Sequence, residues 1–226
     1  KLSAIFGDID PRNIQLFLSK RTEEGDIVIM KAHEKARDMM KAICPHLKIG
    51  VTLSIYDFQT VSGGEQEMQE ELNDEFLHYL PYLEKDDFFG LQNYTRKIFG
   101  ADGVIPPSDD VELTQMNYEF YPQSIGHVAR LVAQHLNVPI IITENGVATS
   151  DDQRRIAFIQ EAMTSVKECI DDGIPIVGYM HWSLLDNFEW MLGFDITFGL
   201  IEVDRNTQKR KPKESLFVLG RQLERE

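Results

Sequence analysis

Cysteine is nearly absent from this sequence. Only Cys44 and Cys169 occur, far apart and each inside a segment with helical spacing. Two isolated cysteines exclude a disulfide framework and a cysteine-based metal site. We interpret both as small packing residues, which suits a reducing compartment. We expect the protein to need no cofactor and no metal.

Positive charge and long apolar runs are also scarce. The chain has 23 lysines and arginines against 37 acidic residues, a net charge of −14. This charge disfavours nucleic acid and anionic membranes as partners. No apolar run approaches the ~20 residues of a membrane span, and no signal-peptide pattern opens the sequence, so we expect a cytoplasmic location. The first residue is Lys1 rather than methionine, which indicates a removed segment or part of a longer chain.

What remains is an ordinary globular composition. Of the 226 residues, 42% are apolar and 27% are charged, which is enough apolar material for one sizeable core. No linker-like or low-complexity segment divides the chain. We therefore expect residues 1–226 to belong to a single domain.

Short apolar runs alternate with segments of helical spacing along the whole chain. We predict helices over 13–20, 23–44, 66–83, 122–136, 153–171 and 212–223. We predict strands over 48–54, 88–93, 139–143, 176–182 and 198–203, with loops over 56–65 and 97–115. Strands that alternate with helices pair in parallel through right-handed crossovers, which makes this an α/β protein.

The number of strands favours a particular α/β architecture. A complete (β/α)8 TIM barrel needs eight β/α units, and about four are visible here. We therefore expect half of such a barrel. A doubly wound sheet is the alternative, but no glycine-rich phosphate-binding turn supports it.

Residues 139–146 are the first stretch that points to chemistry. Pro139 is followed by three isoleucines and then by Thr143, Glu144, Asn145 and Gly146. An unbroken apolar run is typical of a strand buried on both faces, and Glu144 falls at its end. The C-terminal ends of barrel strands carry catalytic residues. The alternative is that Glu144 only caps the next loop.

Residues 178–190 are the second such stretch, with two tryptophans and two acids close together. The C–H face of a sugar ring stacks on an indole, and its hydroxyls donate to carboxylates. Trp182 follows the predicted strand and suits either a core or a sugar platform. Trp190, between Glu189 and Met191, is harder to explain by packing alone. This composition favours a carbohydrate-binding site.

Together these motifs resemble glycoside hydrolase family 1, the retaining β-glucosidase-type enzymes on a (β/α)8 barrel. The resemblance runs from about residue 32 to residue 213 and rests on the stretches 143–146, 182–190 and 198–200, in that order. The stretch 87–95 resembles the family's sixth-strand pattern, usually Gly-x-Asn-Tyr-Tyr-Thr, except that Gln92 and Asn93 replace its Asn-Tyr. The resemblance thus covers the C-terminal half of the family's barrel.

The resemblance implies a role for five residues. Glu144 matches the catalytic nucleophile, and Tyr94 the tyrosine that positions it by a hydrogen bond. Trp182 matches the stacking platform, Glu189 the residue that binds the far hydroxyls of the glycone, and Trp190 a donor to a ring hydroxyl. The Glu189-Trp190 pair resembles enzymes that act on unphosphorylated sugars. Thr197 departs from the arginine that commonly precedes Phe-Gly in the family.

One expected motif is missing. The family's general acid/base lies in an Asn-Glu-Pro motif after the fourth strand, and this sequence contains none. Glu65 and Glu119 match no family position, so neither is assigned as the acid. We expect residue 1 to fall after that strand, and we expect the fragment to need its own missing N-terminal half or a second copy as partner.

The resulting hypothesis is retaining hydrolysis of a small β-glycoside or oligosaccharide. Such hydrolysis uses two carboxyl groups ~5–5.5 Å apart, one attacking the anomeric carbon and one protonating the leaving oxygen. With the first alone, we expect slow reaction of unactivated substrates. Two alternatives stay open: a non-catalytic sugar-binding or half-barrel scaffold fragment, and an unrelated α/β protein with chance matches.

Overall fold

A computed structural model describes residue 7 and residues 22–223 of the chain. The predicted helix at 13–20 lies outside the described residues. The chain divides into two compact units, Lys1–Leu47 and Lys48–Glu226. The first unit contains α2 (Glu23–Ile43), which begins where the hydroxyl of Thr22 accepts a 3.1 Å hydrogen bond from the amide of Gly25. The single-domain organisation stays a prediction.

The second unit contains the remaining elements. Its strands are β1 (Thr52–Ser54), β2 (Asp57–Thr60), β3 (Phe89–Gln92), β4 (Arg96–Gly100), β5 (Gly103–Ile105), β6 (Ile140–Asn145), β7 (Ile176–His181), β8 (Ile201–Val203) and β9 (Arg210–Pro212). Its helices are α3 (Glu65–Glu75), a 3-10 turn (Leu77–Tyr79), α4 (Leu80–Leu83), α5 (Ser124–His135), α6 (Asp152–Asp171) and α7 (Glu214–Leu223).

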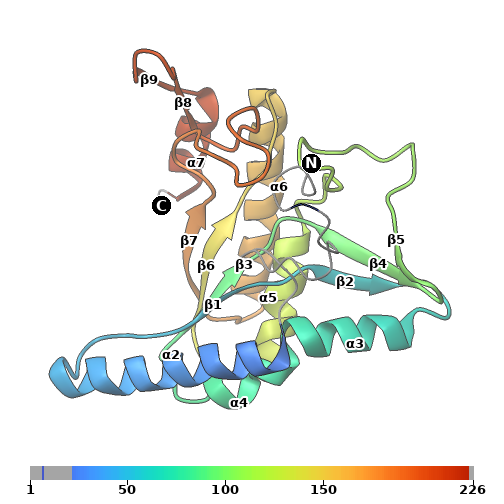
Figure 1. Ribbon diagram of the computed structural model, residues 1–226. Coiled ribbons are helices and arrows are strands. Elements are labelled where there is room, and N and C mark those ends of the chain that lie inside the picture. The colour runs from blue at the N-terminus through green and yellow to red at the C-terminus, as the bar shows by residue number, and fades with distance from the viewer. Residues whose placement is uncertain (1–6, 8–21, 224–226) are drawn as a thin grey trace. The chain divides into compact units, whose positions relative to one another are not determined.

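The main sheet has four parallel strands in the order β1-β3-β6-β7. This confirms parallel pairing for four of the five predicted strands, whereas the fifth, predicted over 198–203, contributes β8, which pairs antiparallel with β9. The helices α5 and α6 lie between successive strands in the chain and stand behind the sheet in Figure 1. Within residues 22–223 the sheet does not close into a barrel.

One face of this sheet is buried beneath the helices. Ile140 and Ile142 of β6 and Leu91 of β3 are completely buried there. Phe76, which follows α3, packs edge-to-face against Phe89 of β3 with ring centroids 5.8 Å apart. These side chains alternate along each strand with residues that point to the other face, as the pleat requires.

The other face is open and carries small side chains. Thr52, Gly90, Ile141 and Gly178 form one row across the four strands. Ile141 is partly exposed, so the prediction that β6 is buried on both faces is wrong. An apolar run does not show whether a second layer covers it. A Cβ at Gly90 would lie 2.8 Å from that of Thr52, so only glycine fits between its neighbours.

Four short strands were not predicted, and three of them, β2, β4 and β5, lie together. The region 56–65, predicted as a loop, contains β2, and the region 97–115 contains most of β4 and all of β5. They form a second sheet in the order β2-β4-β5 beside the C-terminal ends of β1 and β3 (Figure 1). Gly100 and Gly103 made this region resemble a loop, but they flank the tight turn between β4 and β5.

Two helical predictions also change. The helix predicted over 66–83 is broken after Glu75, because a proline in a helix interior clashes with the carbonyl four residues earlier, and Pro81 would meet that of Leu77. The last helix begins at Glu214 rather than at residue 212. Pro212 instead ends β9, which pairs with β8 as an antiparallel hairpin.

Candidate active site

Glu144 lies near the C-terminal end of β6, where the strand register slips. Leu91 pairs with Ile142, but the next residue of β3, Gln92, pairs with Glu144 instead of Thr143. Such bulges redirect side chains and are common beside active sites. Here the bulge brings the side chain of Glu144 opposite Gln92 and Tyr94.

Both carboxylate oxygens of Glu144 accept a hydrogen bond from a neighbouring side chain. The amide of Gln92 donates to Oε1 at 3.0 Å, and the hydroxyl of Tyr94 donates to Oε2. Burial, and then the hydrogen bond and charge of Glu144, raise the pKa of Tyr94. Tyr94 therefore remains a protonated donor at neutral pH, and the carboxylate is fixed at both ends.

A cavity of about 290 Å³ surrounds this carboxylate. All five residues singled out from the sequence contribute to its lining. Four others complete it: Gln92, Met116, Tyr118 and Phe198. Gln92 had been noted only as a departure from a motif, although its spacing of two from Tyr94 on a strand indicates the same face. Tyr118 and Met116 come from the long loop after β5, and no sequence signal placed them here.

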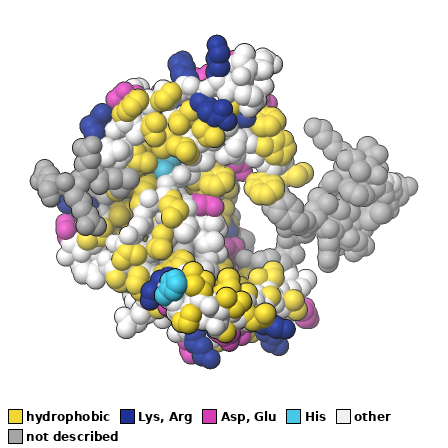
Figure 2. All heavy atoms as spheres, turned by 90° about the vertical axis from the view of Figure 1, so that its left-hand side faces the viewer, with side chains coloured by type: hydrophobic (Ala, Val, Ile, Leu, Met, Phe, Trp, Pro, Cys, Tyr) yellow, Lys and Arg dark blue, Asp and Glu magenta, His cyan; other side chains and the backbone are white. Residues whose placement is uncertain are grey.

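The tryptophans lie on the segment after β7. The amide of Trp182 donates to the carbonyl of Asn145 at 2.9 Å, so this residue continues the pairing of β7 with β6. Trp190 sits in a tight turn closed by hydrogen bonds between Glu189 and Gly193, with φ of 28°. It is 56% exposed, so it is not a core residue. Figure 2 faces the β7 side of the sheet, where hydrophobic side chains gather.

A buried ion pair holds this segment in place. The ammonium group of Lys213 lies 3.1 and 3.0 Å from the two carboxylate oxygens of Asp186, and the amide of Gly199 donates to Oδ1 at 2.8 Å. Burial lowers the pKa of Lys213. The pair ties the middle of the 182–190 segment to the hairpin of β8 and β9.

A buried polar network fixes the strand ends below the cavity. Asn93 donates to the carbonyl of Ile55 at 2.8 Å and accepts from the hydroxyl of Ser124 at 2.6 Å. The amide of Asn145 donates to the carbonyl of Asn93 at 2.8 Å, and its oxygen accepts from Tyr179 at 2.8 Å. Asn93, the second departure from the family motif, therefore links the end of β3 to the segment after β1, to α5 and to β6.

Thr197, the third departure, also has a structural role. Its amide and hydroxyl both donate to the side-chain oxygen of Gln115, at 3.0 and 3.1 Å. Its carbonyl accepts from the fully buried Arg155 at 3.1 Å. Thr197 thus connects the long loop that carries Tyr118 to the segment after β7.

Among the described residues, no other acid stands beside Glu144 and Glu189 in the lining of this cavity. Glu119 is held by Arg96 through hydrogen bonds of 2.8 and 2.5 Å and lines a different cavity. Glu65 accepts from the amide of Gly63. His181 is neutral at ordinary pH, because burial and then the charge of Arg155 lower its pKa to about 3. None of the three suits a proton donor for this cavity.

Metal chemistry finds no ligands in this part of the molecule. No group of three or more histidine, cysteine, aspartate or glutamate side chains within residues 22–223 is arranged to hold a metal ion. Over the same residues, no helix is both long enough and apolar enough to span a membrane.

The match to known proteins decides the family. The model of glycosyl hydrolase family 1 matches residues 29–220, which include all nine residues that line the cavity. The chain belongs to glycosyl hydrolase family 1. This confirms the resemblance predicted from the sequence motifs.

Several family 1 proteins are similar over most of this chain. β-Glucosidase A of Thermotoga maritima is 30% identical over 83% of this chain and 53% of its own length. A β-galactosidase of Pyrococcus woesei is 30% identical over 74% of this chain and 36% of its own length. A β-glucosidase structure superposes with a TM-score of 0.82 and 43% identity over 87% of this chain and 48% of that one. The chain spans about half the length of the relatives it matches most fully.

Glu189 is the second carboxylate of the family 1 cavity, and its pKa is raised. Burial is the larger cause and the charge of Glu144 the smaller. The folded protein therefore binds this proton more tightly than the unfolded chain does. The contribution of Glu189 to stability should be fully present at low pH and should be lost as pH rises from the ordinary carboxyl range through the raised pKa.

We expect Glu189→Gln to remove the part of the pH dependence of stability that Glu189 causes. At pH 7 the variant should melt higher than the wild type, by less than about 2 °C because Glu189 is partly exposed, and at pH 3 the difference should vanish. Thermal unfolding at the two pH values measures this, with Glu161→Gln on the exposed side of α6 as the control. A variant that melts lower than the wild type at pH 7 would contradict the assignment of the shift.

Proposed function

We propose that this chain supplies the nucleophile side of a retaining β-glycosidase. The observation that carries the proposal is the carboxylate of Glu144, held at both oxygens by Gln92 and Tyr94 in a cavity that also contains Trp182 and Glu189. A fixed, ionised carboxylate is what attack on an anomeric carbon requires. The names of the β-glucosidase relatives support a β-glucoside or related β-glycoside as substrate.

The proposed reaction has two steps. The Glu144 carboxylate attacks the anomeric carbon, the bond to the leaving oxygen breaks, and a proton donor delivers a proton to that oxygen. Water then attacks the resulting glycosyl ester and frees Glu144. Trp182 stacks on the sugar, while Glu189 and Trp190 bind its hydroxyls. We infer that the proton donor comes from outside residues 22–223, because no suitable acid among them lines the cavity.

The edges of the main sheet and the coverage of the relatives support a proposal for the complete architecture. We propose that the four parallel strands are half of a (β/α)8 barrel whose other strands would pair with β1 and β7. Both are edge strands within the described sheet, and its open face presents small side chains to a missing layer. The coverage of about half of each structural relative supports this proposal.

A mechanism-based label tests the function without the missing acid. A 2-deoxy-2-fluoro-β-glucoside with a dinitrophenolate leaving group needs no protonation, and the fluorine slows hydrolysis of the ester. We expect mass spectrometry to find one fluoroglucosyl group on the 226-residue chain, and peptide mapping to assign it to Glu144. A sugar-binding scaffold would bind the compound and remain unlabelled.

We expect Tyr94→Phe to slow this labelling by roughly 10- to 100-fold, the cost of losing a hydrogen bond to a charged group. The matched control is Tyr179→Phe, which removes the same hydroxyl from a tyrosine that donates to Asn145. The control should lower stability and change the labelling rate by less than about 3-fold. Equal slowing by the two variants would contradict a positioning role for Tyr94.

We also expect a preference for unphosphorylated sugars. Glu144 and Glu189 repel an added phosphate, and no described lysine or arginine lines the cavity. A 6-phosphorylated form of the label should react roughly 100-fold more slowly than the neutral one. Glu189→Gln should reduce this difference between the labelling rates of the neutral and the phosphorylated compound. Faster labelling by the phosphorylated compound would refute this specificity.

A further inference from the structure

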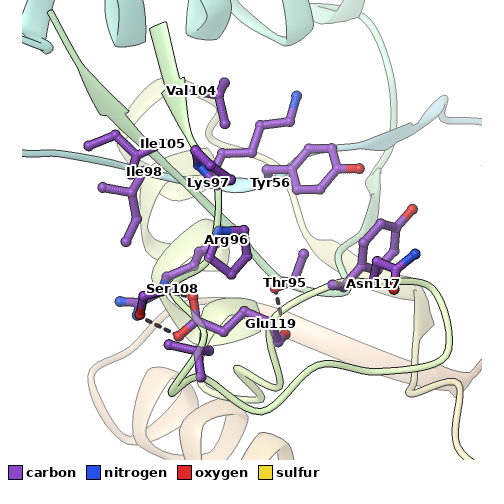
Figure 3. Close-up of a pocket in the computed structure, with 14 residues that line it drawn as sticks. Tyr56, Thr95, Arg96, Lys97, Ile98, Val104, Ile105, Ser108, Asn117 and Glu119 are labelled. Atoms are coloured by element: carbon purple, nitrogen blue, oxygen red, sulfur yellow. Dashed lines mark hydrogen bonds and ion pairs between the residues drawn. The ribbon is translucent and has the colours of Figure 1, made fainter.

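A second cavity of about 370 Å³ lies next to the candidate active site (Figure 3). It lies between β4, β5 and the long loop that follows them. Tyr118 lines both cavities, so they share a wall. Tyr56 lies between β1 and β2, and Thr95 lies between β3 and β4, so this cavity also lies near the C-terminal ends of two main-sheet strands.

The strand order places the two cavities on opposite sides of Glu144. In the sheet β1-β3-β6-β7, the segment with Trp182, Glu189 and Trp190 follows β7. The second cavity is built on the other side, from residues after β1 and β3. A substrate whose sugar lies over the β7 side would therefore extend its leaving group past Tyr118 towards the second cavity.

Most polar side chains of this cavity are already engaged within the protein. Arg96 donates to Glu119 and, at 3.0 Å, to Gln59. Lys97 lies 2.6 Å from Glu71, with its ammonium group 4.2 Å from the ring centre of Tyr56. These groups are poorly available to the many hydroxyls of a further sugar residue.

Other polar groups nearby are satisfied in the same way. The hydroxyl of Thr95 donates to the carbonyl of Glu119 at 2.8 Å, and that of Ser108 to Asp110 at 2.5 Å. Most of the remaining wall is aliphatic, and Asn117 and Tyr118 are its other polar residues. In Figure 3, Ile98, Val104 and Ile105 lie together on one side of the cavity. Val104 is 51% exposed and Ile105 41%, so apolar surface faces solvent here.

We infer that this second cavity binds the leaving group of the substrate and selects an apolar aglycone, alkyl or aryl, over further sugar residues. The inference rests on the proposed function, because it takes Glu144 as the point of attack. Burial of an aliphatic chain against these side chains is favourable, whereas a sugar would lose hydration without gaining hydrogen bonds.

Isothermal titration of the 226-residue chain with methyl, hexyl and cellotriose-derived β-glucosides tests this inference. Hexyl β-glucoside should bind roughly 10- to 30-fold more tightly than methyl β-glucoside, because part of the alkyl chain is buried. Methyl β-cellotrioside should gain no comparable affinity. Tighter binding of the trioside than of the hexyl compound would overturn the inference in favour of a sugar subsite.

Substitutions test whether the second cavity causes the tighter binding of hexyl β-glucoside. Ile105→Asn should reduce the hexyl-to-methyl ratio to less than about 3-fold, since the polar side chain breaks the aliphatic wall. The matched control is Ile170→Asn on α6, where the isoleucine is 48% exposed and lies outside both cavities. Val104→Asn provides a second test should Ile105→Asn not fold. An unchanged ratio in a folded cavity variant would overturn the inference.

The fluoroglucoside label separates this inference from the proposed function. Labelling of Glu144 in a chain that binds hexyl and methyl glucosides equally would refute the apolar leaving-group site alone. Failure to label Glu144 in the wild type would refute the proposed function, and with it the identification of this cavity as a leaving-group site.

Discussion

Replacing Glu144 by alanine is expected to lower turnover of dinitrophenyl β-glucoside by at least about 10⁴-fold, because no other group can form the glycosyl ester. Initial rates of dinitrophenolate release by the 226-residue chain measure this loss. Glu67→Ala, on the exposed side of α3, is the matched control and should leave the rate unchanged. Retention of a tenth of the activity by the Glu144 variant would contradict the assignment.

Added azide shows from which side of the sugar the carboxylate of Glu144 attacks. In Glu144→Ala the anion can enter the space left by the carboxylate and attack the anomeric carbon from the same side. The product should then be the α-glucosyl azide, with dinitrophenolate release partly restored. Formation of the β-azide would show that azide attacked from the opposite side of the sugar, which would contradict the role proposed for Glu144.

The second large effect concerns the missing proton donor. We expect the chain alone to hydrolyse dinitrophenyl β-glucoside measurably and an alkyl β-glucoside negligibly, because only the alkoxide leaving group needs a proton. A family 1 segment that carries Asn-Glu-Pro, supplied in trans, should accelerate the alkyl substrate by roughly 10²–10⁴-fold. The dinitrophenyl substrate should gain much less.

The same experiment examines the state of the isolated chain. Val177 of the edge strand β7 is 65% exposed, and Ile141 and Val51 are only partly covered. Exposed strand edges promote association, so sedimentation should show dimers or aggregates that the added segment suppresses. Rapid hydrolysis of the alkyl glucoside by a stable monomer of this chain alone would mean that an acid has been missed and that the half-barrel proposal is wrong.

The sequence was most informative where local chemistry dictates local structure. The isoleucines of β6 and the helical spacing of 153–171 led to the correct order of strands and helices. The sheet β2-β4-β5 was missed because its strands are short and contain glycine and charged residues, and because β2 pairs with β4, which lies far along the chain. Pairing of that kind is a tertiary property that no window of sequence contains.

The candidate site was likewise only partly predictable from the sequence. The residue types at 144, 182 and 189–190 indicated sugar chemistry, and their roles came from the resemblance rather than from physics. The bulge that turns Glu144 towards Gln92 depends on how β3 and β6 pair, so the donation from Gln92 was not predictable. The contribution of Tyr118 depends on a loop tied down by Thr197 and Gln115.

Gly146 has a consequence for anyone who wishes to redesign this site. A Cβ at that position would lie 1.9 Å from the carbonyl oxygen of Trp182, so the backbones after β6 and β7 touch there. The spacing between Glu144 and the indole of Trp182 is therefore set by main-chain contact rather than by packing of side chains. Mutant libraries that vary Met116, Tyr118 or Phe198 should reshape the cavity while this spacing stays constant, provided that position 146 is left untouched.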